Sequence, residues 1–242
     1  MEEKIKLLEQ VALEFGLSLQ DVVDSWVCQG LVEVPSCKNI IDINKKQPKE
    51  GVVNLDFPKN DIRLQTKLFW YAFEGGKFSP NPKTYPNCQG VVGWINPDPN
   101  APEGERIYVV LPEQKYLQYS ERYYLTGADD LYDGRANTKK LIEYGKKYRV
   151  RFPAVECAHN YTKNGVKKGE TFLPAREQLK LVVENCEGVR KALKLIGGTF
   201  EGWLWSSSEY NSNYAWNVYS SDGDMYGNDK EHTNSVSCFL AY

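Results

Sequence analysis

The last forty residues of the chain, Trp203–Tyr242, combine strand-like alternation with a polar, tryptophan-containing composition. Apolar and polar residues alternate in AWNVY and SVSCFLAY, which predicts strands; in the second, Val236, Cys238 and Leu240 share one face. SDGD at residues 221–224 predicts a tight turn between two strands. Polar, Asn-rich tails are usually disordered because they bury too little apolar surface. The tryptophans and the terminal CFLAY predict that this one is packed.

The same stretch has the composition of a binding surface. Six Ser, five Asn, four Tyr and two Gly occupy the 29 positions from Ser206 to Asn234, a mixture typical of antibody paratopes. Tyr offers a large, stiff contact at low entropy cost, while Ser, Asn and Gly adapt their hydrogen bonding. A Ser/Asn-rich meander with solvated outer faces is the simpler alternative and stays open here. The interleaved residues expected to face inward are Trp205, Ala215, Trp216, Val218, Met225, Val236, Cys238 and Leu240.

The rest of the chain predicts an α+β fold, because a strand pair is followed by helices and then by the β-rich end. Periodicity predicts further helices near the N-terminus and short strands between proline-rich breaks. Gly188 is expected to break or kink the last helix, while Thr138 and Pro174 are expected at helix starts. The expected elements are helices over 2–15, 18–29, 134–149 and 174–196, strands over 52–55 and 68–73, and a hairpin of 91–95 with 107–111.

The two N-terminal helices also fit a helix-turn-helix. The second helix, however, carries Asp21 and Asp24 and no Lys or Arg to reach phosphates, so a helical hairpin is favoured. Such a hairpin would pack on the body of the protein or on a second copy, which makes it a candidate element for homo-oligomer formation. The whole chain has 30 Lys and Arg against 32 Asp and Glu, a net charge of −2, which argues against a nucleic-acid partner.

No apolar run approaches the roughly 20 residues that cross a bilayer, so no membrane span is expected. The first residues, MEEKIKLLEQ, lack the basic and apolar regions of a signal peptide. Six cysteines form no CxxC, and there are two histidines, so we expect no zinc cluster and no other metal or cofactor. Free buried thiols are favoured over disulfides. The cysteines are Cys28, Cys37, Cys88, Cys157, Cys186 and Cys238.

Three kinds of active or metal site are weighed and not favoured. Glu156, Cys157 and His159 could be drawn as a Cys-His-acid site, but members of such triads normally meet through the fold rather than along the chain. A glycosidase-like carboxylate set would use Asp222, Asp224 and Glu209, yet both aspartates lie in the predicted turn. A calcium site would use the oxygen-rich SDGDMYGND, with Asp222, Asp224, Asn228 and Asp229, whose spacing departs from an EF-hand.

Several motifs together carry a family resemblance: FPAVECAHNY, TFLPAREQL, VRKALKLIGG, WLWSSSEYNSNYAWNV and the final SVSCFLAY. Together with QGVVGWINP and RIYVVLPE they resemble the DUF1566 type of C-type-lectin-like domain. The likeness is closest to the variable proteins of diversity-generating retroelements in gut bacteria and their phages. It covers roughly residues 85–242. The resemblance implies a C-type-lectin-like (formylglycine-generating-enzyme-like) fold for this part, with a variable region at about 203–242. The residue pattern before it predicts an N-terminal helical segment at 1–34 and an irregular connecting region at 35–84.

In such proteins, adenine mutagenesis of a template repeat turns Asn codons into codons for Tyr, Ser, Asp, His and Gly. The resemblance therefore implies a non-enzymatic adhesin or receptor-recognition protein that binds a protein or glycan ligand. Trp205, Ser206, Ser207, Trp216 and Gly223 would be scaffold. The implied ligand-binding residues are Glu209, Tyr210, Asn213, Tyr214, Asn217, Tyr219, Ser221, Asp222, Asp224, Tyr226, Asn228, Lys230, His232 and Asn234.

The alternatives are a generic lectin-like carbohydrate-binding or structural domain, or an enzyme of the formylglycine-generating fold. That enzyme needs two closely spaced cysteines near the C-terminus, and Cys238 has no such neighbour in the sequence, since the preceding cysteine is Cys186. Fold alone does not fix function, so function is argued from the site. A phage particle, the cell surface and the cytoplasm are all compatible with the residues.

Overall fold

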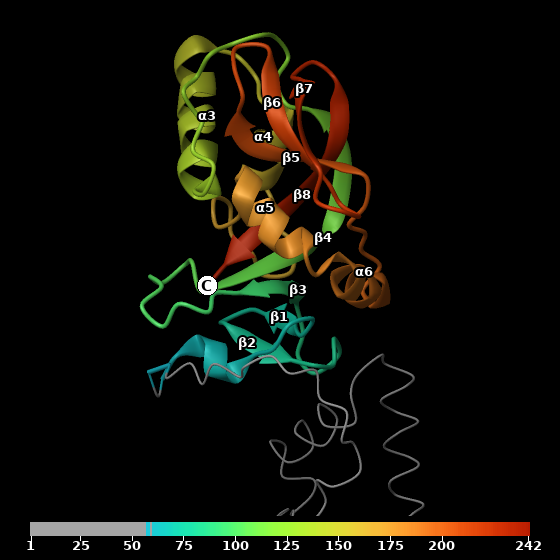
Figure 1. Cartoon of the computed structure of the whole chain (residues 1–242). Coiled ribbons are helices and arrows are strands. Elements are labelled where there is room, and N and C mark those ends of the chain that lie inside the picture. Colours follow the sequence, from blue (N-terminus) through green and yellow to red (C-terminus); the bar gives the residue numbers. More distant parts are fainter. Residues whose placement is uncertain (1–56, 59) are drawn as a thin grey trace, which may run out of the picture. The chain divides into compact units, whose positions relative to one another are not determined.

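The chain divides into two compact units, residues 1–56 and 57–242. The computed structural model describes residues 57–58 and 60–242, drawn in colour in Figure 1. The predicted N-terminal helices, the predicted strand at 52–55, Cys28 and Cys37 lie outside the described residues. Among the described residues, no helix combines the length and the apolar character needed to cross a membrane.

An eight-stranded sheet forms the centre of the unit, with the order β2-β1-β3-β4-β8-β5-β6-β7. Neighbouring strands are antiparallel except β5 and β8, which pair in parallel. The predicted hairpin of 91–95 with 107–111 is confirmed as β3 and β4, and the turn at 221–224 joins β6 to β7. The strands are β1 (Tyr71–Phe73), β2 (Lys77–Ser79), β3 (Cys88–Ile95), β4 (Ile107–Gln118), β5 (Trp203–Glu209), β6 (Tyr214–Tyr219), β7 (Met225–Asp229) and β8 (Thr233–Ala241).

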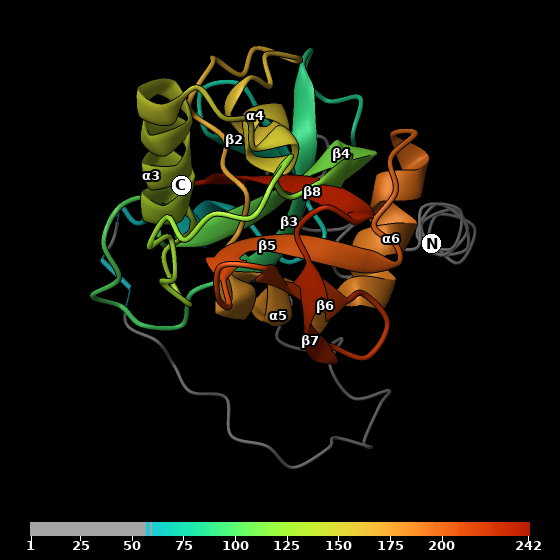
Figure 2. The same cartoon turned by 90° about the horizontal axis from the view of Figure 1, so that it is seen from above.

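Helices cover both faces of this sheet, so the α+β class is confirmed. One core joins α3 and α4 to one face, and a second core joins α5 and α6 to the other. Figure 2 shows the two helix pairs on opposite sides of β8 and β5. The helices are η1 (Ile62–Gln65, a 3-10 turn), α3 (Gly134–Tyr148), α4 (Pro153–His159), α5 (Arg176–Val183) and α6 (Cys186–Leu195).

Strand β8 shows why the C-terminal alternation is so regular. Val236, Cys238 and Leu240 lie in the core with α3 and α4, whereas Phe239 and Ala241 lie in the core with α5 and α6. The predicted two-faced pattern is therefore confirmed, and both faces are buried. A central strand that carries side chains into two cores fixes its register, because a slip by one residue would exchange the two sets.

Some local predictions are wrong in detail. Asp133, not Thr138, caps α3: its side chain accepts a hydrogen bond from the Ala136 amide, while Thr138 is buried within the helix. Gly188 does not break a helix but lies in the first turn of α6, after α5 has ended at Val183. Pro174 precedes the α5 N-cap rather than lying in the first turn.

The compact unit starts at Phe57 rather than at residue 85. The region 35–84 was expected to be an irregular connection, but its part after residue 56 contributes η1, β1 and β2, and β1 pairs with β3. Asp61 and Arg63 hold η1 in place through a buried bidentate ion pair of 2.8 Å. The predicted strand at 68–73 is confirmed over its last three residues as β1, whereas the three-residue strand β2 was not predicted among the proline-rich breaks.

Candidate ligand-binding surface

The fourteen predicted ligand-binding residues fall into three groups by exposure. Tyr219 and Asn228 are half-buried. Glu209, Asn217, Lys230 and Asn234 are buried, so the expectation that these four are displayed is wrong. The exposed residues are Tyr210, Asn213, Tyr214, Ser221, Asp222, Asp224, Tyr226 and His232.

Glu209 and Lys230 form a buried ion pair that holds three segments together. The Glu209 carboxylate lies 2.6 Å from the Lys230 ammonium, and both side chains are almost fully inaccessible. Glu209 also accepts hydrogen bonds from the Thr126 and Gly127 amides at 2.9 Å, and Lys230 donates to the Tyr124 carbonyl at 2.6 Å. Burial lowers the pKa of Lys230, and the Glu209 carboxylate opposes that shift. These two residues are scaffold because every charged atom is directed at the protein itself.

Asn217 and Asn234 are buried because strand alternation turns them toward the core with α3 and α4. Asn217 pairs with Trp205 across β5 and β6, and Asn234 pairs with Leu117 across β4 and β8. Trp205 belongs to that core, and paired residues point to the same face. The Oδ1 atom of Asn217 and the Nδ2 atom of Asn234 have no hydrogen-bond partner among the described residues.

One exposed aromatic cluster lies on the face of β6 that carries Tyr214 and Trp216. Register places Tyr214 opposite Asp229 and Trp216 opposite Gly227. The ring of Tyr210 meets that of Trp216 edge-on at 4.8 Å. A Cβ atom on Gly227 would lie 3.0 Å from the Tyr210 ring, so the glycine lets this ring lie close against the strand. Tyr210 remains 56% exposed, so it is held in place and still displayed.

Two residues from other segments complete this cluster. The Tyr123 hydroxyl donates to the Asp229 carboxylate at 2.8 Å, and this bond raises the pKa of Tyr123 to about 12. The Arg176 guanidinium lies 4.6 Å from the centre of the Trp216 ring, within cation–π range. Sequence reasoning missed both residues because they meet β6 and β7 only through the fold. We call this set the tyrosine face: Tyr123, Arg176, Tyr210, Tyr214, Trp216 and Asp229.

The turn that carries the tyrosine face is tightly hydrogen-bonded. The Asn211 side chain accepts from the Asn213 and Tyr214 amides at 2.8 and 2.9 Å, an Asx-type closure of the turn. The Tyr210 amide donates to the Tyr214 carbonyl at 3.0 Å, and the Lys230 amide donates to the Asn213 carbonyl at 3.0 Å. The backbone amides named here are therefore already hydrogen-bonded within the protein, and the exposed side chains project from this fixed backbone.

A second aromatic cluster lies on the opposite face of the β6–β7 hairpin. Trp203 lies 4.8 Å from Tyr219 and 5.4 Å from Tyr226, measured between ring centres. Tyr226 is 59% exposed and opposes Asn217 in the register. We call Trp203, Tyr219 and Tyr226 the tryptophan face. Trp203 was not among the predicted ligand-binding residues, although its place at the start of an alternating strand could have suggested it.

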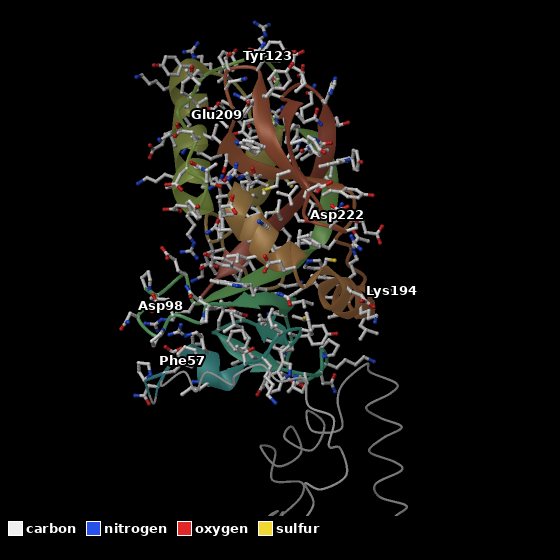
Figure 3. All side chains as sticks on the ribbon, in the orientation of Figure 1. Phe57, Asp98, Tyr123, Lys194, Glu209 and Asp222 are labelled. Atoms are coloured by element: carbon white, nitrogen blue, oxygen red, sulfur yellow. The ribbon has the colours of Figure 1, made fainter. Side chains whose placement is uncertain are left out.

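The exposed predicted residues are thus spread over two faces and both ends of one hairpin. Tyr214 and Tyr219 begin and end β6, and five strand steps separate them by about 17 Å. Figure 3 shows Glu209 near Tyr123, and Asp222 at the other end of the hairpin. The carboxylate set of Glu209 with Asp222 and Asp224 is therefore not assembled. Asp222 instead accepts from the Asp224 amide at 3.0 Å, as expected of a turn. In residues 57–242 as described, no group of three His, Cys, Asp or Glu residues is placed to hold a metal.

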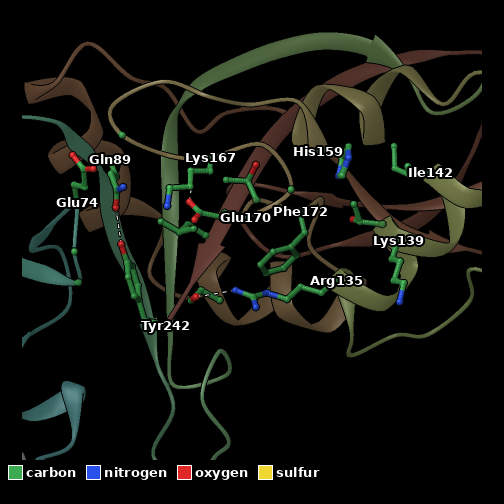
Figure 4. Close-up of a pocket in the computed structure, with 18 of the residues that line it drawn as sticks. Glu74, Gln89, Arg135, Lys139, Ile142, His159, Lys167, Glu170, Phe172 and Tyr242 are labelled. Carbon is green, nitrogen blue, oxygen red and sulfur yellow. Dashed lines mark hydrogen bonds between the residues drawn. The ribbon is translucent and has the colours of Figure 1, made fainter.

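A large cleft lies elsewhere, between α3, the segment 159–172 and the C-terminal end of β8 (Figure 4). Its volume is about 970 Å³, and none of the fourteen predicted residues lines it. Arg135 is committed to the Ala241 carbonyl at 2.8 Å, and Tyr242 donates to Gln89 at 2.6 Å. Four Lys or Arg and three Glu side chains line the cleft, so its charge is nearly balanced and indicates no particular ligand class.

The suggested Cys-His-acid trio is not assembled either. Cys157 lines a groove of about 370 Å³, whereas His159 lines the large cleft. Glu156 is bound to Arg151 at 2.9 Å rather than to the histidine. Burial, followed by Lys168 and Lys146, lowers the pKa of His159. Cys157 instead lines this groove together with Cys238 from β8, a neighbour that the sequence did not reveal. The four described cysteines, which also include Cys88 and Cys186, are free thiols.

Comparison with known proteins shows a likeness of fold. No protein-family profile matches the chain, and no curated protein matches its sequence. Among solved structures, the fold is similar to that of a fimbrial protein from Bacteroides ovatus, with a TM-score of 0.60 and 14% sequence identity. The match covers 73% of this chain and 49% of that protein, so the chain spans about half the length of the solved structure it matches. At this identity the likeness concerns the fold alone.

Proposed function

We propose that this protein is a non-enzymatic binding protein whose tyrosine face recognises a macromolecular ligand, a protein or a glycan. The observation that carries the proposal is the exposure of Tyr210 and Tyr214 on a hydrogen-bonded turn, with Tyr123 from another segment beside them. The turn is bonded to Lys230, which belongs to a buried ion pair. Tyrosines held in this way lose little side-chain entropy when a ligand arrives, which favours binding.

The spread of the exposed residues favours a large ligand. A single sugar ring is shorter than the distance of about 17 Å between the two ends of β6. A protein surface or an extended glycan can contact the tyrosine face and reach the turn at 221–224 in one complex. Arg176 and Asp229 add one charge of each sign beside the tyrosines, so the face suits a polar partner of mixed charge rather than a polyanion.

The resemblance of residues 85–242 to C-type-lectin-like variable proteins supports a role in display. Adenine mutagenesis would exchange outward-facing Asn for residues such as Tyr, Ser and Asp. It would leave the scaffold of buried strands intact. The fold likeness to a fimbrial protein favours a surface or adhesin-like role. The retroelement origin has its own test, a nearly identical, adenine-differing repeat beside a reverse-transcriptase gene in the flanking DNA.

An array of immobilised glycans and extracellular proteins, probed with the full chain, tests the function. The Tyr210→Ala and Tyr214→Ala variants should lower the strongest signal at least tenfold, in line with about 2 kcal/mol for an aromatic anchor. Lys139→Ala, on the wall of the large cleft, is the matched control and should leave the signal unchanged. Loss of signal in the Lys139 variant with retention in both tyrosine variants would place the ligand in the cleft and refute the proposal.

A further inference from the structure

Two thiols from distant parts of the chain meet in the groove beside α4. Cys157 lies on α4 and Cys238 on β8, and the two side chains pack in the same hydrophobic cluster. Cys157 is partly exposed and Cys238 is 2% exposed, while both line the groove of about 370 Å³. One thiol of the pair is therefore reachable by a small molecule, and the other lies behind it.

We propose that Cys157 and Cys238 form a dithiol site that hydroperoxides oxidise to an intramolecular disulfide, with Cys157 attacking and Cys238 resolving. This inference goes beyond the proposed binding function and does not depend on it. The order of the two roles follows from access, because a peroxide can reach the half-buried sulfur but not the buried one. Redox-reactive cysteines are characteristically accessible and placed beside a resolving thiol.

The surroundings of Cys157 favour its thiolate. The hydrogen bond with Cys238 lowers the pKa of Cys157 to about 7, burial opposes this shift, and the Lys115 ammonium adds to it. The Glu113 carboxylate acts in the opposite direction, but it is engaged by Lys163 in an ion pair. The same hydrogen bond raises the pKa of Cys238, so this thiol keeps its proton while Cys157 reacts. A thiol with a pKa near neutrality combines a high thiolate fraction with good nucleophilicity.

A buried hydroxyl without a partner also borders the groove. Tyr161 is 7% exposed, and its hydroxyl has no hydrogen-bond partner among the described residues. Burial, reinforced by Glu113, raises its pKa to about 12, so the hydroxyl remains a proton donor at neutral pH. A buried donor of this kind is costly unless something accepts from it, and an oxygen atom of a bound peroxide is a suitable acceptor.

The chemistry balances in two steps. The Cys157 thiolate attacks one oxygen of the hydroperoxide, the O–O bond breaks, and the leaving alkoxide takes a proton to become an alcohol, or water when the oxidant is hydrogen peroxide. Cys157 is then a sulfenic acid. The Cys238 sulfur loses its proton and attacks the Cys157 sulfur, so that the S–S bond forms, the S–O bond breaks and water leaves. The two thiols give up two electrons, which reduce the peroxide.

Hydrogen peroxide treatment of the full-length protein, followed by alkylation and peptide mapping, tests the site. We expect a peptide that links Cys157 to Cys238, and no such link after Cys157→Ser. Cys186→Ser is the matched control, because Cys186 is a half-buried thiol outside the groove, and it should leave the link intact. Recovery of both thiols in reduced form under peroxide, or of Cys157 linked to a different cysteine, would overturn the proposal.

The Cys238→Ala variant adds a measurement that a merely structural thiol would not change. In the unaltered protein, the rate of Cys157 alkylation should rise with a midpoint near pH 7. Removal of Cys238 should move that midpoint up toward the ordinary thiol value, and peroxide should then leave a sulfenic acid at Cys157 that dimedone traps. An unmoved midpoint would contradict the assigned pairing. If this variant does not fold, the peptide map of the unaltered protein still decides.

Discussion

At the scale of single residues, the buried ion pair shows how polar residues can serve as scaffold in a surface-rich segment. Glu209 and Lys230 have the residue types of a displayed surface, and nothing in their spacing distinguishes them from their exposed neighbours. The structure turns both inward, where they bind the segment around Gly127 to the end of β5. Charge alone therefore does not predict which residues are exposed. Glu209 and Lys230 are buried because they pair with each other, and they lie 21 positions apart in the sequence.

Lys230→Met should destabilise the protein by about 3–5 kcal/mol, because it leaves the Glu209 carboxylate buried without its cation. Chemical denaturation of the variant and the unaltered protein measures the difference. Lys191→Met is the matched control: Lys191 pairs with Glu187 on the surface of α6, where water and salt screen the two charges, so its loss should change the stability little. An equal loss of unfolding free energy in the two variants would show that the buried Glu209–Lys230 pair stabilises the protein no more than the surface pair does.

Asp61 should make the stability depend on pH in the acid range. Hydrogen bonds from Arg63 lower the pKa of Asp61 from 3.8 to about 2, so the folded protein binds this proton at lower pH than the unfolded chain does. The stabilisation is therefore complete above about pH 4 and is lost as the pH falls through 2. Asp61→Asn should accordingly lower the free energy of unfolding most at neutral pH. The difference in this free energy between the variant and the unaltered protein should become smaller between pH 4 and 2. Denaturation curves at several pH values measure this difference. A difference that stays the same from neutral pH to pH 2 would refute the prediction.

At the scale of elements, long periodic segments were predictable, whereas most of the short ones were not. The β3–β4 hairpin, α3 and β8 follow directly from their hydrophobic patterns, because each is long enough for its period to repeat. Helix α4 was not predicted, because its seven residues make only about two turns and its hydrophobic period hardly repeats. Two of the six residues of the tyrosine face, Tyr210 and Tyr214, were predicted from residue type. Trp216 had been expected to face inward, and Tyr123 and Arg176 join the face only through tertiary contacts.

Gly90 tests the packing of the central strands. A Cβ atom at this position of β3 would lie 2.2 Å from the Val110 carbonyl oxygen on β4, and backbone cannot move aside cheaply. Gly90→Ala should therefore cost at least about 2 kcal/mol of unfolding free energy. Gly227→Ala, in the edge strand β7, is the control, because its new methyl group meets only the exposed ring of Tyr210. A cost for Gly227→Ala equal to that for Gly90→Ala would contradict the assigned register of β3 and β4.

At the scale of the whole molecule, one sheet serves two purposes. Its central strands carry side chains into two cores, and its last hairpin projects aromatic residues from both faces. The dithiol groove uses a different part of the same sheet, where α4 covers β8. The proposed binding surface and the proposed dithiol site therefore occupy separate places, so a variant in one should leave the other unchanged.

Amide hydrogen exchange over residues 203–242 tests most directly whether the displayed side chains stand on a rigid sheet. The amides of Leu204, Val218 and Cys238 lie in buried strands and should exchange only when the whole unit unfolds, while those in the turn at 221–224 should exchange much faster. Fast exchange throughout this segment would contradict the account, because tyrosines on a mobile backbone would lose the pre-organisation on which the proposed binding depends.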